Sequence, residues 1–254
     1  MQFWELPESA EDIFTLFAPA DIRRARDQAL ENIETLLKSV TSRLFFLYNH
    51  PSFPDPELAP ERDALNCVRI LTRILPFLYE AETLGEWEER FFWSRRPRRA
   101  SEVLFDEEQE TNQKLTPDTG GLEDGKPLAE ELIDALIDLL FCGDFTLPKQ
   151  LPGKPKISYN IWQSGVGCNS ALPTTKEYEN NRSEVLRLLL TLASQSIYST
   201  PASLSQTGVK ALTYICTTAD KQVVLSVLCS LLNTVSNLNF PTLHSVRALE
   251  GILA

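Results

Sequence analysis

The sequence is poor in the residues that carry most enzyme chemistry. Its 254 residues include two histidines, His50 and His244, and neither has a Cys, Glu or second His at metal-ligand spacing. The HExxH zinc motif, the Walker A loop, the dinucleotide-binding fingerprint and the nucleophile elbow are all missing. These absences argue against the common metal-dependent, nucleotide-dependent and serine-hydrolase reactions, and we expect no enzyme activity, no cofactor and no small-molecule substrate.

Cysteine, glycine and long apolar runs are also scarce. The five cysteines are an odd number and none forms a CxxC pair, which favours reduced thiols over a disulfide framework. The longest apolar runs fall far short of the roughly 20 residues of a membrane span. The first residues lack the basic and apolar regions of a secretory signal. We therefore expect a cytoplasmic protein that is soluble or attached to a membrane only peripherally.

A surplus of positive charge is missing too. The formal net charge is −11, whereas nucleic-acid binding needs Lys and Arg to neutralise phosphates, so we expect no nucleic-acid partner. Hydrophobic residues make up 43% of the chain and charged residues 23%, as in ordinary soluble globular proteins. With ten glycines and long Leu-rich stretches, the composition favours helices over a sandwich or barrel.

The most informative stretch runs from residue 127 to 147. Apolar residues cover most of its circumference, and its polar positions after the first turn are Asp134 and Asp138, one turn apart. This pattern predicts a helix buried among other helices, with one acidic edge in water. We expect Pro127 in its first turn and Gly143 as a left-handed cap after its end.

Helical periodicity extends over most of the remaining chain. Ser9 has the spacing of an N-cap for a short helix that ends at Pro19. Pro76 lies inside one apolar pattern and should kink or end that helix early. Asn181 is a candidate N-cap further on. The expected helices after the first are 21–48, one from about 60 with an apolar stripe to Leu78, 86–93, 181–198, 209–217 and 220–235.

These elements predict an all-α fold. Helices of this length suggest an armadillo/HEAT-like solenoid of antiparallel helix pairs with two long irregular loops, although no sequence repeat is visible. We divide the chain into helical hairpins at 1–93, a charged disordered insertion at 94–126, a second helical segment at 127–235 and an uncertain tail at 236–254. The second segment contains a loop at 142–180, whose residues Phe145, Ile157, Tyr159, Ile161, Trp162 and Val166 could pin it to the helices.

One stretch has the composition of an interaction patch. Aromatic residues and arginines stand together and could bind an anionic membrane or an acidic protein segment. Acidic residues follow directly, so the alternative is a solvated charge run whose two blocks nearly cancel, and we favour it. The candidate patch consists of Phe91, Phe92, Trp93, Arg95, Arg96, Arg98 and Arg99.

Two weaker chemical candidates remain. Glu130, Asp134 and Asp138 could form a metal-binding carboxylate face, but bundle sites of that kind also need Glu-x-x-His motifs that are absent here. We favour a solvated helix edge. Cys168, within Gly165-Val166-Gly167-Cys168, could be a nucleophile, but the nearest histidine in sequence is distant and a structural turn is the better interpretation.

Seven segments together resemble the Hid/dymeclin-like family, named for high-temperature-induced dauer formation. They follow the family's order, reach about Thr234, and are FWELPESAEDIFTLFAPADIRRAR, LNCVRILTRILPFLYE, RFFWS, PLAEELIDALIDLLFCGDFT, YNIWQSGVG, NRSEVLRLLLTLASQSIY and LLNT. The tail after Thr234 departs from the family pattern. We expect the N-terminal portion of a longer, fungal-type member.

The resemblance implies a cytosolic helical-repeat protein, peripheral on Golgi membranes, that serves secretory traffic through vesicle or secretory-granule biogenesis. It implies a non-enzymatic scaffold whose partners are proteins of the Golgi and secretory machinery. Animal members carry a myristoylation glycine at position 2, but Gln2 stands here, so lipid anchoring cannot be carried over. A soluble α-helical adaptor without a membrane role is the alternative, and an enzyme using Cys168 or the acidic stripe is less favoured.

Overall fold

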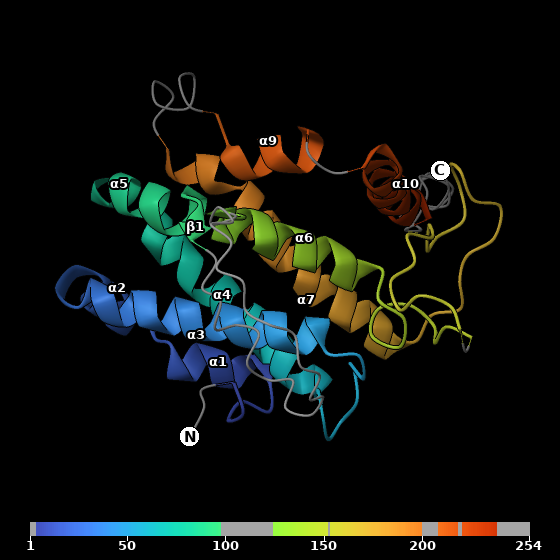
Figure 1. Cartoon of the computed structure of the whole chain (residues 1–254), viewed down its shortest axis with the longest axis horizontal. Coiled ribbons are helices and arrows are strands. Elements are labelled where there is room, and N and C mark those ends of the chain that lie inside the picture. Colours follow the sequence, from blue (N-terminus) through green and yellow to red (C-terminus); the bar gives the residue numbers. More distant parts are fainter. Residues whose placement is uncertain (1–3, 98–123, 152, 200–207, 218–219, 238–254) are drawn as a thin grey trace, which may run out of the picture.

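The structure is a computed structural model that describes residues 4–97, 124–151, 153–199, 208–217 and 220–237 (Figure 1). Within them the chain forms helices and one short antiparallel ribbon. The elements are α1 (Ala10–Leu16), α2 (Pro19–Gln28), α3 (Leu30–Asn49), α4 (Glu61–Tyr79), η1 (Glu82–Leu84), α5 (Gly85–Glu88), η2 (Glu89–Trp93), β1 (Arg96–Pro97), β2 (Asp124–Gly125), α6 (Leu128–Leu140), α7 (Lys176–Ala193), η4 (Gln195–Tyr198), α9 (Lys210–Thr217) and α10 (Lys221–Asn237).

Helix α1 begins as its sequence predicts. Ser9 is the N-cap, the Asp12 amide donates to its hydroxyl, and the Asp12 carboxylate accepts from the Ser9 amide at 2.9 Å. This reciprocal capping box satisfies two amides that a helix start leaves without partners. The segment before α1 is tied down because the buried Asn66 amide of α4 donates to the carbonyls of Trp4 and Pro7.

The prediction of one long helix at 21–48 is wrong, because the chain forms two helices, α2 and α3, in this region. Ala29, with φ −148° and ψ 53°, leaves helical geometry and separates α2 from α3. Both helices pack against α4. A break at Ala29 lets the apolar sides of α2 and α3 approach α4 in different directions, with Ile22 buried on one and Leu37 on the other.

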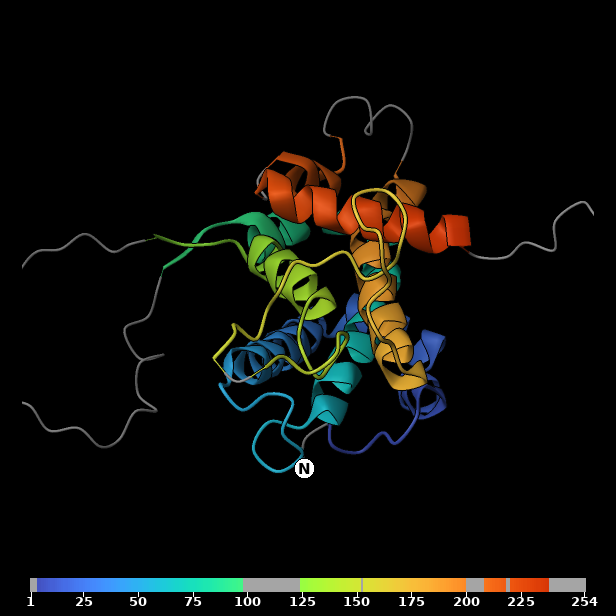
Figure 2. The same ribbon diagram turned by 90° about the vertical axis from the view of Figure 1, so that its right-hand side faces the viewer.

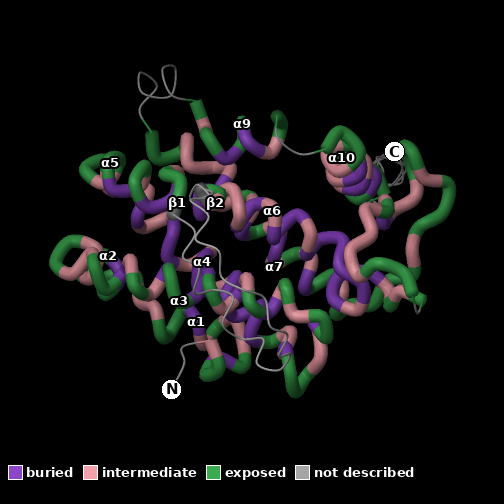
Figure 3. Tube along the Cα trace, viewed as in Figure 1, coloured by how far each residue is buried: buried purple, intermediate pink, exposed green. Residues whose placement is uncertain are grey.

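Helix α4 is the central element of the N-terminal part. It packs against α1, α2, α3 and α7, and its residues from Asp63 to Val68 are all buried (Figure 3). The buried Asp63 carboxylate is neutralised by Arg43 of α3 at 2.8 Å. Pro76 does not end the helix early, because α4 continues to Tyr79. The helix therefore tolerates the missing amide of Pro76 within its last turn.

Helix α6 is the buried core helix that its sequence predicts. Leu132, Ile133, Leu136, Leu139 and Leu140 are fully buried, and α6 packs against α3, α7, α9 and η2. Its start differs by one residue from the expectation, because Pro127 is the N-cap and lies before the first turn.

The end of α6 also differs. Asp144, with φ 65°, takes the left-handed conformation that we expected at Gly143. Asp is one of the few residues other than Gly that adopt this conformation at modest cost. The Asp144 side chain also accepts a hydrogen bond from the Tyr178 hydroxyl of α7 at 3.2 Å. Gly143 serves close packing instead, since a Cβ there would lie 2.9 Å from Cγ of Gln150.

The long connection between α6 and α7 is packed against the helices, as expected. Phe145 is fully buried, Trp162 is nearly so, and Phe141 contacts the rings of Tyr159 and Trp162 with centroids 5.3 and 5.4 Å apart. Val166 is an exception, because 65% of it is exposed. Aromatic anchoring therefore holds this segment in place without regular secondary structure.

Helix α7 begins earlier than its apolar pattern indicates. Thr175 is the N-cap, with its hydroxyl accepting from the Tyr178 amide, so the expected cap at Asn181 is wrong. Asn181 lies inside α7 and donates from its buried amide to the Phe145 carbonyl at 3.0 Å. The apolar pattern missed the first turn because it is polar and solvated.

The last helices lie where they were expected. Asp220 precedes α10 and accepts from the Gln222 amide at 2.9 Å. In Figure 2, α10 lies across the top of the molecule, beside the long loop after α6. We predicted a disordered insertion at 94–126. Its two ends instead pair as strands β1 and β2, which corrects the prediction for these residues. Its centre and the tail from residue 238 lie outside the described residues.

The all-α class is confirmed for the described part of the chain. Buried positions concentrate on α4 and α6 and on the sides of α3 and α7 that face them (Figure 3). The finer expectation, a solenoid of stacked helix pairs, stays a prediction.

Candidate interaction surface

The aromatic half of the predicted patch lies inside the protein. Phe91 and Phe92 are buried with 7% and 3% of their surfaces exposed. With Trp87 they form an aromatic cluster, in which Trp87 stacks on Phe91 at 5.0 Å and Phe92 meets Phe91 edge-on at 4.7 Å. These two side chains therefore stabilise the core and cannot anchor a partner, which corrects this part of the patch.

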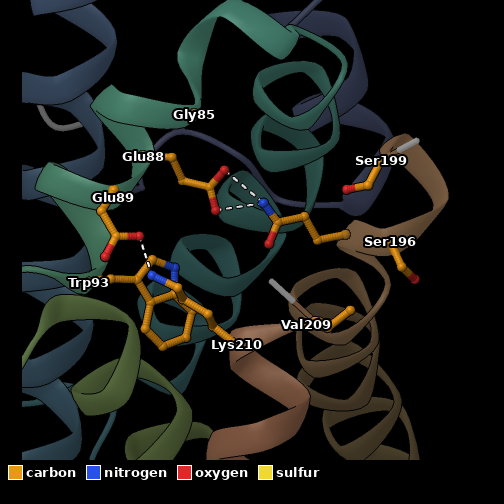
Figure 4. Close-up of a pocket in the computed structure, with 10 residues that line it drawn as sticks. Gly85, Glu88, Glu89, Trp93, Ser196, Ser199, Val209 and Lys210 are labelled. Atoms are coloured by element: carbon orange, nitrogen blue, oxygen red, sulfur yellow. Dashed lines mark hydrogen bonds and ion pairs between the residues drawn. The ribbon is translucent and has the colours of Figure 1, made fainter. Parts of the chain in front are cut away.

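Trp93 borders a pocket of about 230 Å³ between η2, η4 and α9 (Figure 4). Lys210 of α9 lies over the Trp93 ring and forms an ion pair with Glu89. The neighbouring Glu88 carboxylate accepts from the Gln195 side-chain amide at 2.7 Å, and burial raises the pKa of Glu88. These polar groups are satisfied by one another, so the pocket has a structural explanation.

The arginine half of the patch is divided. Arg95 and Arg96 are exposed, and Arg96 forms an ion pair with Glu131 of α6 at 2.5 Å. Arg98 and Arg99 lie outside the described residues. Binding of a membrane or an acidic partner by these arginines stays a prediction.

The acidic stripe of α6 is bonded to tyrosines rather than simply solvated. Asp138 accepts from the hydroxyl of Tyr48 in α3 at 2.6 Å and from that of Tyr159. Asp134 accepts from the Tyr214 hydroxyl of α9 at 3.0 Å and from Lys126 at 2.8 Å. The edge is partly solvated, since 40% of the Asp134 side chain is exposed, but its carboxylates also join α6 to α3, to α9 and to the loop.

The tyrosine partners are distant in sequence, with Tyr48 lying 90 residues from Asp138. No periodicity or motif marks such a pair, so sequence reasoning missed these contacts. Burial, followed by the Asp138 hydrogen bond, raises the pKa values of Tyr48 and Tyr159 above their usual range. For Tyr214, burial and Asp134 raise the pKa to about 12. The tyrosines therefore remain protonated donors at neutral pH.

Removing the Asp138 carboxylate should cost stability. We expect Asp138→Ala to lower the free energy of unfolding by about 2 kcal/mol, because two half-buried hydroxyls lose their acceptor. Asp138→Asn, which keeps an acceptor oxygen, should lose less. Urea denaturation of the three proteins measures this, and equal stability of Asp138→Ala and the parent would contradict a structural role for the carboxylate.

The other chemical candidates have no catalytic arrangement in the part of the chain that the structure describes. No group of three or more His, Cys, Asp or Glu side chains there is placed to hold a metal ion. The Cys168 sulfur lies 3.0 Å from the Ser170 carbonyl oxygen, and the Cys168 and Gly165 backbones exchange two hydrogen bonds. The Gly165–Cys168 segment is thus a tight turn, as the structural interpretation predicted.

This turn is bound by polar side chains of α10. The Asn233 carboxamide donates to the carbonyls of Gln163 and Val166 at 2.9 and 3.1 Å and accepts from the Val166 amide at 2.7 Å. Thr234 accepts from the Trp162 indole at 3.1 Å. Sequence analysis missed Asn233, because an asparagine in an apolar helix carries no signal for a loop 67 residues away.

An acidic cluster joins the starts of α4 and α7. Burial and the nearby Glu177 raise the pKa of Glu61 to about 7, with Asp144 and Asn181 close by. The folded protein therefore holds this proton more tightly than the unfolded chain, whose glutamates titrate near 4.5. The stability that the proton contributes is complete below about pH 4.5 and is lost as the pH rises through 7.

We expect Glu61→Gln to remove this dependence. Above pH 7 the variant should be more stable than the parent, because the parent must ionise a partly buried acid beside other carboxylates. The difference should shrink toward pH 4.5, where Glu61 is neutral in the folded protein. Denaturation midpoints of both proteins between pH 4.5 and 8 measure it, and a constant difference across this range would disprove the assignment.

No single helix among the described residues is long and apolar enough to cross a membrane. The pair α9 and α10 reaches that length and composition together, but the two helices are bent by 111° relative to each other.

Comparison with known proteins gives a consistent result. A family profile described as "High-temperature-induced dauer-formation protein" matches residues 1–247. The Schizosaccharomyces pombe protein named "Ubp5-interacting protein ftp105" is 37% identical over 92% of this chain and 31% of its own length. The proteins named "Protein HID1" from mouse and human are each 31% identical over 92% of this chain and 28% of their own length.

The chain thus spans less than a third of the length of these relatives. No solved structure matches it. The family profile covers almost the whole chain, and the names of the family and of these relatives carry no enzyme designation. On this match, the chain belongs to the Hid1 family of high-temperature-induced dauer-formation proteins.

Proposed function

We propose that this protein is a non-enzymatic scaffold in Golgi-associated secretory traffic. Its membership in the Hid1 family carries the proposal, because the resemblance implies vesicle or secretory-granule biogenesis at the Golgi. The protein is cytoplasmic in this proposal and attaches peripherally to Golgi membranes. Its partners are proteins of the secretory machinery.

The chemistry of the described side chains supports a binding role. Their most prominent carboxylates, Asp134 and Asp138, are engaged by tyrosine hydroxyls that hold helices together. The Cys168 sulfur lies 3.7 Å from the Ile161 carbonyl oxygen and 3.0 Å from that of Ser170. The S. pombe relative is named for its interaction with another protein, Ubp5, and that name favours a role in protein binding.

Membrane fractionation tests the proposal. The tagged protein, expressed in fungal cells, should sediment in part with a Golgi marker and be released from the pellet by high salt or carbonate. Release distinguishes peripheral attachment from an integral span. Arg95→Glu with Arg96→Glu should increase the soluble share if the exposed arginines meet anionic lipid, and Lys149→Glu with Lys154→Glu is a control of equal charge change.

A soluble adaptor without a membrane role is the second candidate. It is favoured by the relative's name, which records a protein interaction and no membrane. An entirely soluble protein that still co-purifies with specific partners would support this candidate against the first. Affinity capture from the soluble fraction and from the Golgi fraction, compared side by side, separates the two.

We also propose that the helices belong to an armadillo-like array. Helices α3 and α4 contact each other, as do α4 and α7, and α6 and α7, so packing passes from one helix to the next. Such arrays expose long surfaces on which several proteins can assemble, which suits a scaffold. An experimental structure of a longer family member would decide whether this packing repeats.

A further inference from the structure

Helix α10 turns polar residues toward the protein and large apolar residues toward solvent. Ser226, Ser230 and Asn233 are buried, with 7%, 0% and 2% of their surfaces exposed. They bond to the loop after α6, which includes a hydrogen bond from Ser226 to the Tyr159 carbonyl at 2.8 Å. The opposite side carries four residues that are more than half exposed: Leu225, Leu228, Leu232 and Val235.

In most surface helices the apolar side faces the core and the polar side faces solvent; α10 has the opposite orientation. Hydrogen bonds hold helix α10 to its own protein: Ser226, Asn233 and Asn237 donate to carbonyls of the loop after α6, and the Ser230 hydroxyl accepts from the Trp162 amide. Partly buried apolar residues such as Val227 add to these contacts. The four exposed side chains, which we call the leucine stripe, form one continuous apolar strip along the helix. The largest exposed apolar patch on a soluble protein is often functional.

The spacing of the leucine stripe specifies the kind of partner. Its residues are separated by three, four and three positions, which is the a/d pattern of a coiled coil over two heptads. A stripe that repeats every 3.5 residues fits along another helix crossing at roughly 20°. The stripe therefore fits an α-helix with an apolar stripe of its own.

The charge of α10 indicates which kind of partner the leucine stripe can bind. From Gln222 to Asn237, α10 has no charged residue, although the whole chain carries a net charge of −11. A helix that binds anionic membranes normally carries Lys and Arg on its polar side, and α10 has none there. Two acidic copies of the protein can meet along residues 222–237 with little repulsion, because the only charged residue of α10 is Lys221 at its first position.

We propose that the leucine stripe of α10 is a self-association surface, on which α10 of a second copy packs about a two-fold axis. The same stripe from both copies is self-complementary, as an isologous contact requires. Each α10 is already folded on its scaffold, so association does not have to order the helix. Stable dimers bury about 800 Å² per partner, which is more than four half-exposed side chains provide, so the proposed dimer is weak and reversible.

Sedimentation equilibrium of the full chain tests the proposal. The weight-average mass should rise from one copy toward two as the concentration increases from about 1 to 100 µM, the range of a weak interface. Leu228→Gln with Leu232→Gln should remain monomeric throughout, because Gln removes apolar contact while retaining good helix propensity. Circular dichroism and melting of this variant should match the parent, which shows that the fold is intact.

Leu58→Gln with Leu151→Gln is the matched control. These leucines are 60% and 68% exposed, and Leu151 borders a pocket with Ser52 and Phe53 rather than the leucine stripe. This variant should dimerise like the parent. A parent that stays monomeric at 100 µM overturns the proposal. So does a dimer that persists in the Leu228→Gln, Leu232→Gln variant, or a monomer that instead floats with neutral phosphatidylcholine vesicles, which would assign the stripe to a lipid surface.

Discussion

Leu136→Asp is expected to unfold the protein. Leu136 is fully buried in α6, which packs against α3, α7, α9 and η2. The substitution removes a core side chain, which by itself costs about 2–5 kcal/mol, and places a carboxylate where no partner is available. A total loss on the order of 5 kcal/mol equals the whole stability of many domains of this size. Loss of the helical circular dichroism transition on heating measures it.

Leu190→Asp is the matched control for this experiment. Leu190 is also a helical leucine, in α7, but 67% of it is exposed. The same substitution there should change the melting temperature by little, because the charge stays in water. If Leu136→Asp melted like the parent, α6 could not be the buried helix that packs against α3, α7, α9 and η2.

Gly165→Ala is the second large effect that we expect. Gly165 has φ +143°, which an L-residue rarely adopts, and a Cβ there would lie 2.4 Å from the Asn233 side-chain oxygen. The loop would have to move away from α10 and lose the three Asn233 hydrogen bonds. Backbone strain and lost hydrogen bonds together should cost about 3 kcal/mol. Denaturation and amide exchange at Val166 measure this cost.

Gly153→Ala is a control that has the backbone strain of Gly165→Ala without its clash with Asn233. Gly153 also has a positive φ, of 85°, but nothing lies within 4 Å of the added Cβ. We expect this variant to lose only about 1 kcal/mol, the cost of the left-handed conformation alone. Equal losses at Gly153 and Gly165 would mean that the loop is not seated on Asn233 as described.

Local patterns predicted several parts of this fold correctly. The capping box at Ser9, the burial of α6 and the start of α10 after Asp220 depend on residues close in sequence, so spacing alone specifies them. The errors at Ala29 and Asn181 have one cause. The spacing of apolar residues does not change where a helix breaks, so it did not reveal the break at Ala29. It also gives no signal for a polar first turn, so it placed the start of α7 too late.

The candidate site was harder to predict than the fold. Proximity in sequence placed Phe91 and Phe92 beside the arginines, but η2 turns both rings into a cluster with Trp87. Composition cannot decide whether an aromatic side chain binds a partner or fills its own core, since both uses favour the same residues. Only the direction of each side chain answers that question.

The sequence by itself determined the helical class, the main helices and the absence of familiar catalytic motifs, because all three depend on residue type and local spacing. Its resemblance to the family rested on the same local segments. Tertiary structure decided that Asp138 is bonded by Tyr48 and Tyr159, that Asn233 holds the Gly165 turn, and that α10 faces its leucines outward. The hydrogen-bonded pairs lie 21 to 90 positions apart, and such pairs form only when the packing of whole helices brings them together.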